Sequence, residues 1–138
     1  MLKFLHIENI AVIERSDIEF TEGFNVLTGE TGAGKSIVID SINAVLGERT
    51  SRELIRAGCD TAEVSAVFGG FDDGSVKILS EYGFTPDEDG NIIVRRRLSS
   101  SGKGLIKLNG IPVTAAQLKE LSKNLINIHG QHDNQALL

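Results

Sequence analysis

The chain has 138 residues, a formal net charge of −5, a single cysteine and no tryptophan. This length allows one domain with a hydrophobic core, and the acidic balance argues against a surface that is basic all round. The lone Cys59 excludes an intrachain disulfide and fits a reducing compartment, and it is expected to be a small buried or half-buried residue without a reactive role. Because there is no signal-peptide core and no apolar run of membrane-spanning length, we expect a cytoplasmic protein without a membrane partner.

Two strands are predicted at the start of the chain, at 2–8 and 12–20, where apolar and polar residues alternate. A turn at 21–23 then leads into a short apolar strand at 24–27. The two first strands are expected to pair in antiparallel fashion ahead of the strand that follows them.

The next segment, Gly29–Ser36, reads GETGAGKS and matches G-x-x-x-x-G-K-[ST], the phosphate-binding loop of nucleoside triphosphatases. It has the flanks the motif requires, a strand before it and a predicted helix at 37–46 after it. Lys35 is expected to reach the β- and γ-phosphates, and the Ser36 hydroxyl to ligate Mg²⁺. A plain glycine turn would not explain Lys-Ser, and the glycine order differs from the dinucleotide fingerprint. The predicted nucleotide contacts are Gly29, Glu30, Thr31, Gly32, Ala33, Gly34, Lys35 and Ser36.

Further elements follow the predicted helix, which Gly47 should end. Strands are expected at 61–68, 92–98 and 105–108, the last two joined by a hairpin, with Asn109-Gly110 as a two-residue turn. A helix at 75–82 should face inward through Val76 and Leu79, with Ile78 as a further candidate. A last helix, capped by Thr114, should run to Leu121, followed by a strand at 124–128. The expected fold class is therefore mixed α/β, with an antiparallel portion beside a nucleotide-binding core.

A self-sufficient hydrolase of this class also needs an apolar strand that ends in Asp, to hold Mg²⁺. The nearest candidate, 64–73, places Asp72 and Asp73 behind two glycines, and an edge strand followed by an acidic turn is the favoured interpretation. The sequence thus contains a phosphate cradle without convincing hydrolytic machinery. We therefore expect residues 1–138 to be a fragment of a longer protein.

The chain resembles the RecN family of bacterial DNA repair proteins along its whole length. The resemblance is carried by the phosphate loop and by residues 2–13, 97–103, 108–113 and 128–132, the last of which read IHGQH. This family is similar to SMC proteins, whose ATP-binding-cassette head is split in sequence by a long coiled coil. The resemblance implies a P-loop NTPase head of the ABC/SMC type, with 1–138 as its N-terminal lobe. It also implies that the acidic strand, the catalytic glutamate and the signature motif follow the coiled coil, in the C-terminal half.

The resemblance assigns Gln131 to the Q-loop glutamine, which contacts Mg²⁺ and the attacking water in such heads. Lys35 and Gln131 are thus the catalytic candidates, and Ser36 and Gln131 the metal ligands, with ATP and Mg²⁺ as cofactors. The implied partners are the C-terminal half of the same head, a second head in an ATP-bound dimer, and DNA. ATP-driven head engagement would control DNA association in double-strand-break repair, at the nucleoid in a bacterial cytoplasm. The fragment alone is expected to hydrolyse ATP weakly or not at all.

Several basic residues have two open interpretations. Related heads use an arginine after the loop helix for nucleotide or DNA contact, and the match lies among Arg49, Arg52 and Arg56, which otherwise are solvated charges. Arg95 and Arg97 share one face of their strand, opposite Arg96, and either contact DNA phosphates or protect an edge strand.

His129 and His132 are three residues apart, but no third or fourth metal ligand accompanies them, so they are interpreted as structural.

Two other functions compete with the RecN-like one. The first is a small P-loop kinase or GTPase, and the second is a non-enzymatic DNA-binding or interaction module with a vestigial nucleotide site.

Overall fold

A six-stranded sheet organises the chain in the computed structural model, which describes residues 1–20 and 32–128. The strand order is β2-β1-β3-β4-β5-β6, and every neighbouring pair is antiparallel. The strands are β1 (Leu2–Ile10), β2 (Ile13–Glu19), β3 (Thr61–Phe68), β4 (Ile92–Ser99), β5 (Leu105–Leu108) and β6 (Ile111–Val113). The helices are α1 (Gly32–Val45), α2 (Asp73–Glu81) and α3 (Ala115–Ile128), with a 3-10 turn η1 (Arg52–Leu54).

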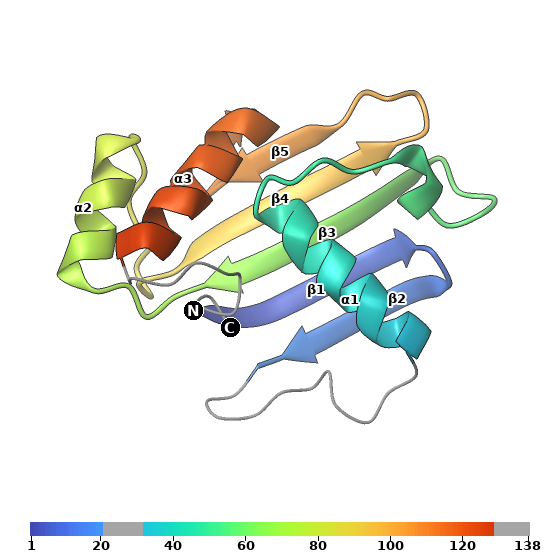
Figure 1. Ribbon diagram of the computed structural model, residues 1–138, viewed down its shortest axis with the longest axis horizontal. Helices are drawn as coiled ribbons and strands as arrows, with labels where there is room; N and C mark the ends of the chain where they lie inside the picture. Colours follow the sequence, from blue (N-terminus) through green and yellow to red (C-terminus); the bar gives the residue numbers. More distant parts are fainter. Residues whose placement is uncertain (21–31, 129–138) are drawn as a thin grey trace.

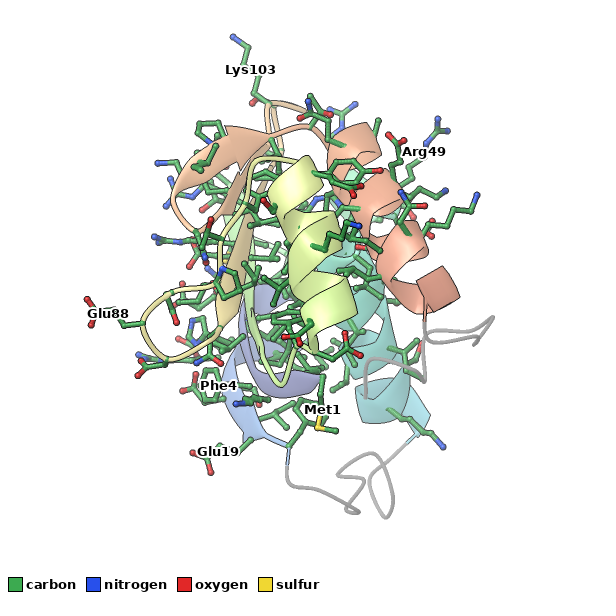
Figure 2. The ribbon with its side chains drawn as sticks, turned by 90° about the vertical axis from the view of Figure 1, so that its left-hand side faces the viewer. Met1, Phe4, Glu19, Arg49, Glu88 and Lys103 are labelled. Atoms are coloured by element: carbon green, nitrogen blue, oxygen red, sulfur yellow. The ribbon has the colours of Figure 1, made fainter. Side chains whose placement is uncertain are left out.

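The described helices lie on one side of this sheet. Figure 1 shows α1 and α3 crossing the same face, with α2 beside α3. Figure 2, turned by 90°, shows the sheet as one layer and the helices as a second. Strand β3 alternates strictly between buried and more exposed positions, as expected when one face of a sheet is covered. Its inner residues and those of β1 form the centre of the core, where Leu5, Ile7 and Val64 are fully buried.

The sheet confirms the antiparallel portion predicted from the sequence. The first two strands pair through a turn in which Ala11 has a φ of 50°, and Phe4 lies opposite Glu19. The β4–β5 hairpin is also present. Asn109 and Gly110, with φ of 48° and 83°, make the predicted two-residue turn, and it leads into β6. The predicted strand at 24–27 lies outside the described residues.

The prediction of a strand at 124–128 is wrong, because helix α3 continues to Ile128. Its apolar and small residues recur every three or four positions, and Leu118, Leu121, Ser122 and Leu125 are all buried. This helical period outweighs the β-branched character of residues 126–128. Thr114 caps the helix as predicted: its Oγ1 accepts from Gln117 N at 3.1 Å, and Gln117 Oε1 accepts from Thr114 N at 2.9 Å.

Two further predictions need correction. Strands β3 and β4 lie inside the sheet, so neither is the edge strand expected from its sequence. On α2, Leu79 is buried and Ile78 packs against the core as expected, but Val76 is 37% exposed. The inward position beside Leu79 belongs to Ser75, which is fully buried one turn earlier.

Candidate nucleotide-binding site

Helix α1 begins at Gly32, inside the phosphate-loop motif. Lys35 and Ser36 are the fourth and fifth residues of this helix, and both side chains are exposed. The first turn of an α-helix offers N–H groups that have no intrahelical acceptor, together with the positive end of the helix dipole. Described residues of the motif thus occupy the helix end that phosphate binding requires. Gly29, Glu30 and Thr31 lie outside the described residues, as do the side chains of Gly32 and Ala33.

Packing on the sheet fixes the orientation of α1. Val38, Ile42 and Val45 recur at helical spacing and are buried against the sheet, Val45 completely. Ser41 is also fully buried, and its hydroxyl donates to Ile37 O at 2.8 Å, so no polar group is left unpaired there. Burial of each large apolar side chain stabilises this arrangement by about 1.5–3 kcal/mol.

The C-terminal end of α1 is closed by Gly47, as predicted. Gly47 has a φ of 95°, and its N–H donates to Ala44 O while Glu48 N donates to Asn43 O at 3.1 Å. This pair of hydrogen bonds is a Schellman motif, which satisfies the last carbonyls of a helix. A Cβ at this glycine would lie 2.4 Å from Lys119 N, so α3 packs directly on the turn.

Arg96 of β4 provides a second anchor for the same helix end. Its Nη1 donates to Ala44 O at 2.8 Å and to Glu48 O at 2.7 Å, and the residue is only 8% exposed. Burial lowers the pKa of the guanidinium from its usual value, yet a cation at a helix C-terminus matches the negative end of the dipole. Among the described residues no carboxylate forms an ion pair with Arg96.

The sequence placed Arg96 opposite Arg95 and Arg97, and the structure confirms this, but the anchoring role was missed. The signal was present in the sequence, since alternation puts Arg96 on the apolar face between Val94 and Leu98. A buried arginine needs hydrogen-bond acceptors, and here two main-chain carbonyls supply them.

The other arginines hold surface segments. Arg52 Nη1 donates to Ser100 O at 3.1 Å and Arg56 Nη1 donates to Val12 O at 3.0 Å, while Arg49 is exposed. On the open face, Arg95 Nε lies 2.9 Å from Glu63 Oε1, and Arg97 Nη2 lies 3.8 Å from the same oxygen. Arg52 and Arg56 therefore have local structural partners.

The two acidic residues that follow β3 lie at the N-terminus of helix α2. Asp72 caps α2, its Oδ1 accepting from Ser75 N at 2.8 Å, and Asp73 lies in the first turn. These two acids thus begin a helix and do not form the acidic turn that was expected.

A possible metal-ligand group within the described part of the chain is His6, Glu8 and Glu63, whose ligand atoms lie within 4.8 Å of one another. These residues are on the sheet face opposite α1, and Glu63 is already paired with Arg95. They are therefore no part of the candidate nucleotide site. Gln131, His129 and His132 lie outside the described residues.

Comparison with known proteins finds a matching family model and similar curated proteins. The family model described as AAA domain matches residues 5–138. DNA repair protein RecN of Bacillus subtilis is 44% identical over the whole chain, and RecN of Haemophilus influenzae is 40% identical over the whole chain. The chain spans about a quarter of the length of these curated relatives, 24% and 25% respectively.

The similar solved structures include SMC heads. An SMC ATPase solved in work on ATP-driven dimerization and DNA stimulated activation has a TM-score of 0.69 and 26% identity, covering 91% of this chain and 79% of that one. The SmcHead bound to the C-winged helix domain of ScpA has a TM-score of 0.67 and 26% identity, covering 91% and 40%. RecF, at 18% identity and a TM-score of 0.64 over 86% of this chain and 27% of its own, shares the fold. Within the described residues, no helix has the length and apolarity needed to cross a membrane.

Proposed function

Because the chain belongs to the AAA domain family and matches RecN proteins along its whole length, we propose that it is the N-terminal part of a RecN-like ATPase head. The observation that carries this proposal is the exposure of Lys35 and Ser36 near the start of a helix that begins inside the phosphate-loop motif. The fold shared with SMC heads supports it.

Mg-ATP fits the donor set of this helix end. Backbone N–H groups of the loop Gly29–Ser36 would hold the phosphates, and Lys35 would neutralise the β- and γ-oxygens. The Ser36 hydroxyl would be a Mg²⁺ ligand, with Gln131 as a second ligand and as the group that orients the attacking water. When bound, Mg-ATP would supply the phosphoanhydride for cleavage, and Mg²⁺ would stabilise the charge on its phosphate oxygens.

The acidic strand and the catalytic glutamate would come from the C-terminal half of the same head. ATP would then be enclosed between two heads, as the ATP-driven dimerization of the similar SMC ATPase suggests. Opening and closing of this dimer would control association with broken DNA during recombinational repair in the bacterial cytoplasm. Without its second half, the segment is expected to bind ATP but to hydrolyse it weakly or not at all.

The first test is calorimetric titration of Mg-ATP into the full chain and into a Lys35→Ala variant. We expect saturable binding to the parent chain and at least a tenfold loss in the variant, since removal of a charge-assisted contact costs about 1.5–3 kcal/mol. Lys123→Ala removes the same charge from an exposed position on α3 and should bind like the parent.

A folded chain that binds Mg-ATP equally well with Lys35→Ala would contradict the assignment of the phosphate loop. Nucleotide-independent DNA binding by a chain that never binds ATP would favour the non-enzymatic alternative. GTP binding in strong preference to ATP would favour the GTPase alternative.

A further inference from the structure

Three side chains that can ligate a metal ion converge on the open face of the sheet, opposite α1. His6 and Glu8 are two residues apart in β1, so strand alternation directs both to this face, and Glu63 lies opposite Glu8 in the neighbouring strand β3. The ring nitrogen or carboxylate oxygen that each offers lies within 4.8 Å of the other two. Figure 2 shows Phe4 and Glu19 on the same side of the sheet, away from the helices.

Asp17 of β2 fixes the histidine ring. It lies opposite His6 in the β1–β2 pair, and its Oδ1 is 2.5 Å from His6 Nδ1. An ionised carboxylate only accepts hydrogen bonds, so Nδ1 carries a proton, and the lone pair for a metal ion is that of the other nitrogen, Nε2. A carboxylate behind the histidine in this way is the usual outer partner of a metal-bound imidazole. The ring is also held by its surroundings, since the His6 side chain is only 16% exposed.

The spacing of the first two ligand atoms suits a metal ion. His6 Nε2 lies 3.2 Å from Glu8 Oε1. Two atoms that bind one tetrahedral zinc ion at about 2.1 Å lie about 3.4 Å apart. The Nε2 of a neutral imidazole and a carboxylate oxygen are both acceptors, so a proton or a metal ion must lie between them to make this contact favourable.

Glu63 adds a third ligand and a further negative charge. Its side chain is 13% exposed and faces Glu8 across the β1–β3 pair, where two like charges repel each other. Arg95 Nε and Arg97 Nη2 lie 2.9 and 3.8 Å from one oxygen of this carboxylate, Oε1. A carboxylate has a second oxygen and about four lone-pair directions, so it can ligate a cation and stay paired with an arginine. Both arginine side chains are also more than half exposed and free to turn into solvent.

We propose that His6, Glu8 and Glu63 bind a zinc ion, with water completing its coordination. Asp17 is then the residue that orients the histidine. Zinc sites with three protein ligands drawn from His and Glu keep a fourth position for water. Mg²⁺ and Ca²⁺ prefer oxygen ligands, so the imidazole nitrogen disfavours them. The ion would link β1 to β3 on the face opposite α1, independently of the nucleotide site proposed above.

Calorimetric titration of zinc chloride into the metal-free full chain tests the site. We expect saturable binding, and a melting temperature that rises with zinc because the ion binds the folded state. Glu8→Gln keeps the size of a half-exposed side chain but removes a charged ligand, and it should weaken zinc binding at least about tenfold. Glu19→Gln makes the same change at an exposed position on the same face, opposite Phe4, and should bind zinc like the parent chain.

Further variants separate this site from the other zinc-binding side chains of the sequence, which has three histidines and one cysteine. His6→Asn should also weaken binding at least about tenfold, whereas Cys59→Ser combined with His129→Asn and His132→Asn should leave it unchanged. Asp17→Asn keeps all three ligands and should weaken binding by about 10–100-fold, because the histidine loses its orienting carboxylate.

Two outcomes overturn the proposal. In the first, zinc binding survives in Glu8→Gln and His6→Asn but is lost in the triple variant, which assigns the ion to other residues. In the second, a folded parent chain shows no saturable zinc binding, so that a proton lies between His6 and Glu8. Circular dichroism without zinc checks that each variant is folded. Mg-ATP titration of Glu8→Gln separates the two proposals, since this variant should bind nucleotide like the parent.

Discussion

The two faces of the sheet use the same residue type in opposite ways, and strand β4 shows both within three residues. Arg95 and Arg97 project from the open face and share the carboxylate of Glu63. Arg96 projects from the covered face, is 8% exposed and donates to two backbone carbonyls at the end of α1. Environment, set by strand alternation, decides whether an arginine is a surface charge or an internal anchor.

Substitutions should therefore matter more on the covered face than on the open face. On the covered face, side chains and turns hold α1 in place. A substitution there leaves hydrogen-bonding groups unpaired or creates a clash. On the open face, ion pairs are solvated and exposed pairs contribute little. A substitution on the covered side should therefore cost more stability than a matched substitution elsewhere.

The largest effect is expected for Gly47→Ala. The residue has a φ of 95°, and a Cβ would lie 2.4 Å from Lys119 N and 2.7 Å from Lys119 Cα. The left-handed backbone and the clash with α3 should together lower the free energy of unfolding by about 3 kcal/mol. Urea denaturation measures this. Gly58→Ala is the control, because Gly58 has a similar φ of 85° with nothing within 4 Å, and it should lose only about 1 kcal/mol. Equal losses of unfolding free energy at both glycines would show that α3 does not pack against the turn at Gly47.

A smaller loss, about 2 kcal/mol, is expected for Arg96→Met, which keeps much of the apolar stem but removes the hydrogen bonds to Ala44 O and Glu48 O. Amide hydrogen exchange should rise in the last turn of α1 at the same time. Arg95→Met, one residue away on the open face, should change stability by less than about 1 kcal/mol. A cost at Arg95 that matches the cost at Arg96 would contradict the contrast between the faces.

The smallest effect should come from His6 on the open face, and it should depend on pH. A hydrogen bond to Asp17 raises the pKa of His6 above 6.5, partial burial opposes this, and Glu8 adds to it. Because the folded pKa is raised, the stabilisation is complete below about pH 6.5 and is lost as pH rises through the folded pKa. The difference in unfolding free energy between the parent and Asp17→Asn should therefore be larger at pH 6 than at pH 9. A pH-independent difference would mean that His6 does not titrate against Asp17.

Local pattern was enough to predict much of this fold. Strand-like stretches and a hairpin signal predicted β1 to β5, Gly47 predicted the end of α1, and Thr114 predicted the start of α3. Each of these signals lies within a few residues of the feature it controls, so a single sequence contains it.

Features that depend on distant partners were not predictable in the same way. Strand order is set by pairings such as that of β1 with β3, and nothing local distinguishes an interior β4 from an edge strand. The three residues of β6 include Pro112, which disfavours a strand unless it lies at an edge, as it does here. At the end of α3, residues 126–128 resemble a strand on their own, and only the continued spacing from Leu118 shows the helix. For the site, Lys35 and Ser36 follow from a motif, whereas the anchoring of α1 by Arg96 links residues 52 positions apart.

The interior position of β1 has a consequence for how the molecule assembles. Leu2 pairs with Phe68 and Glu8 with Glu63, so the first strand made gains its second neighbour only after residues 11–60 have been made. The intervening chain, with the phosphate-loop motif and α1, forms a loop whose closure entropy opposes this pairing. Contacts of such high sequence separation slow folding. During synthesis from the N-terminus, the β1 edge of the β1–β2 hairpin therefore stays unpaired until β3 has been made. Such an unpaired strand edge is exposed to other chains.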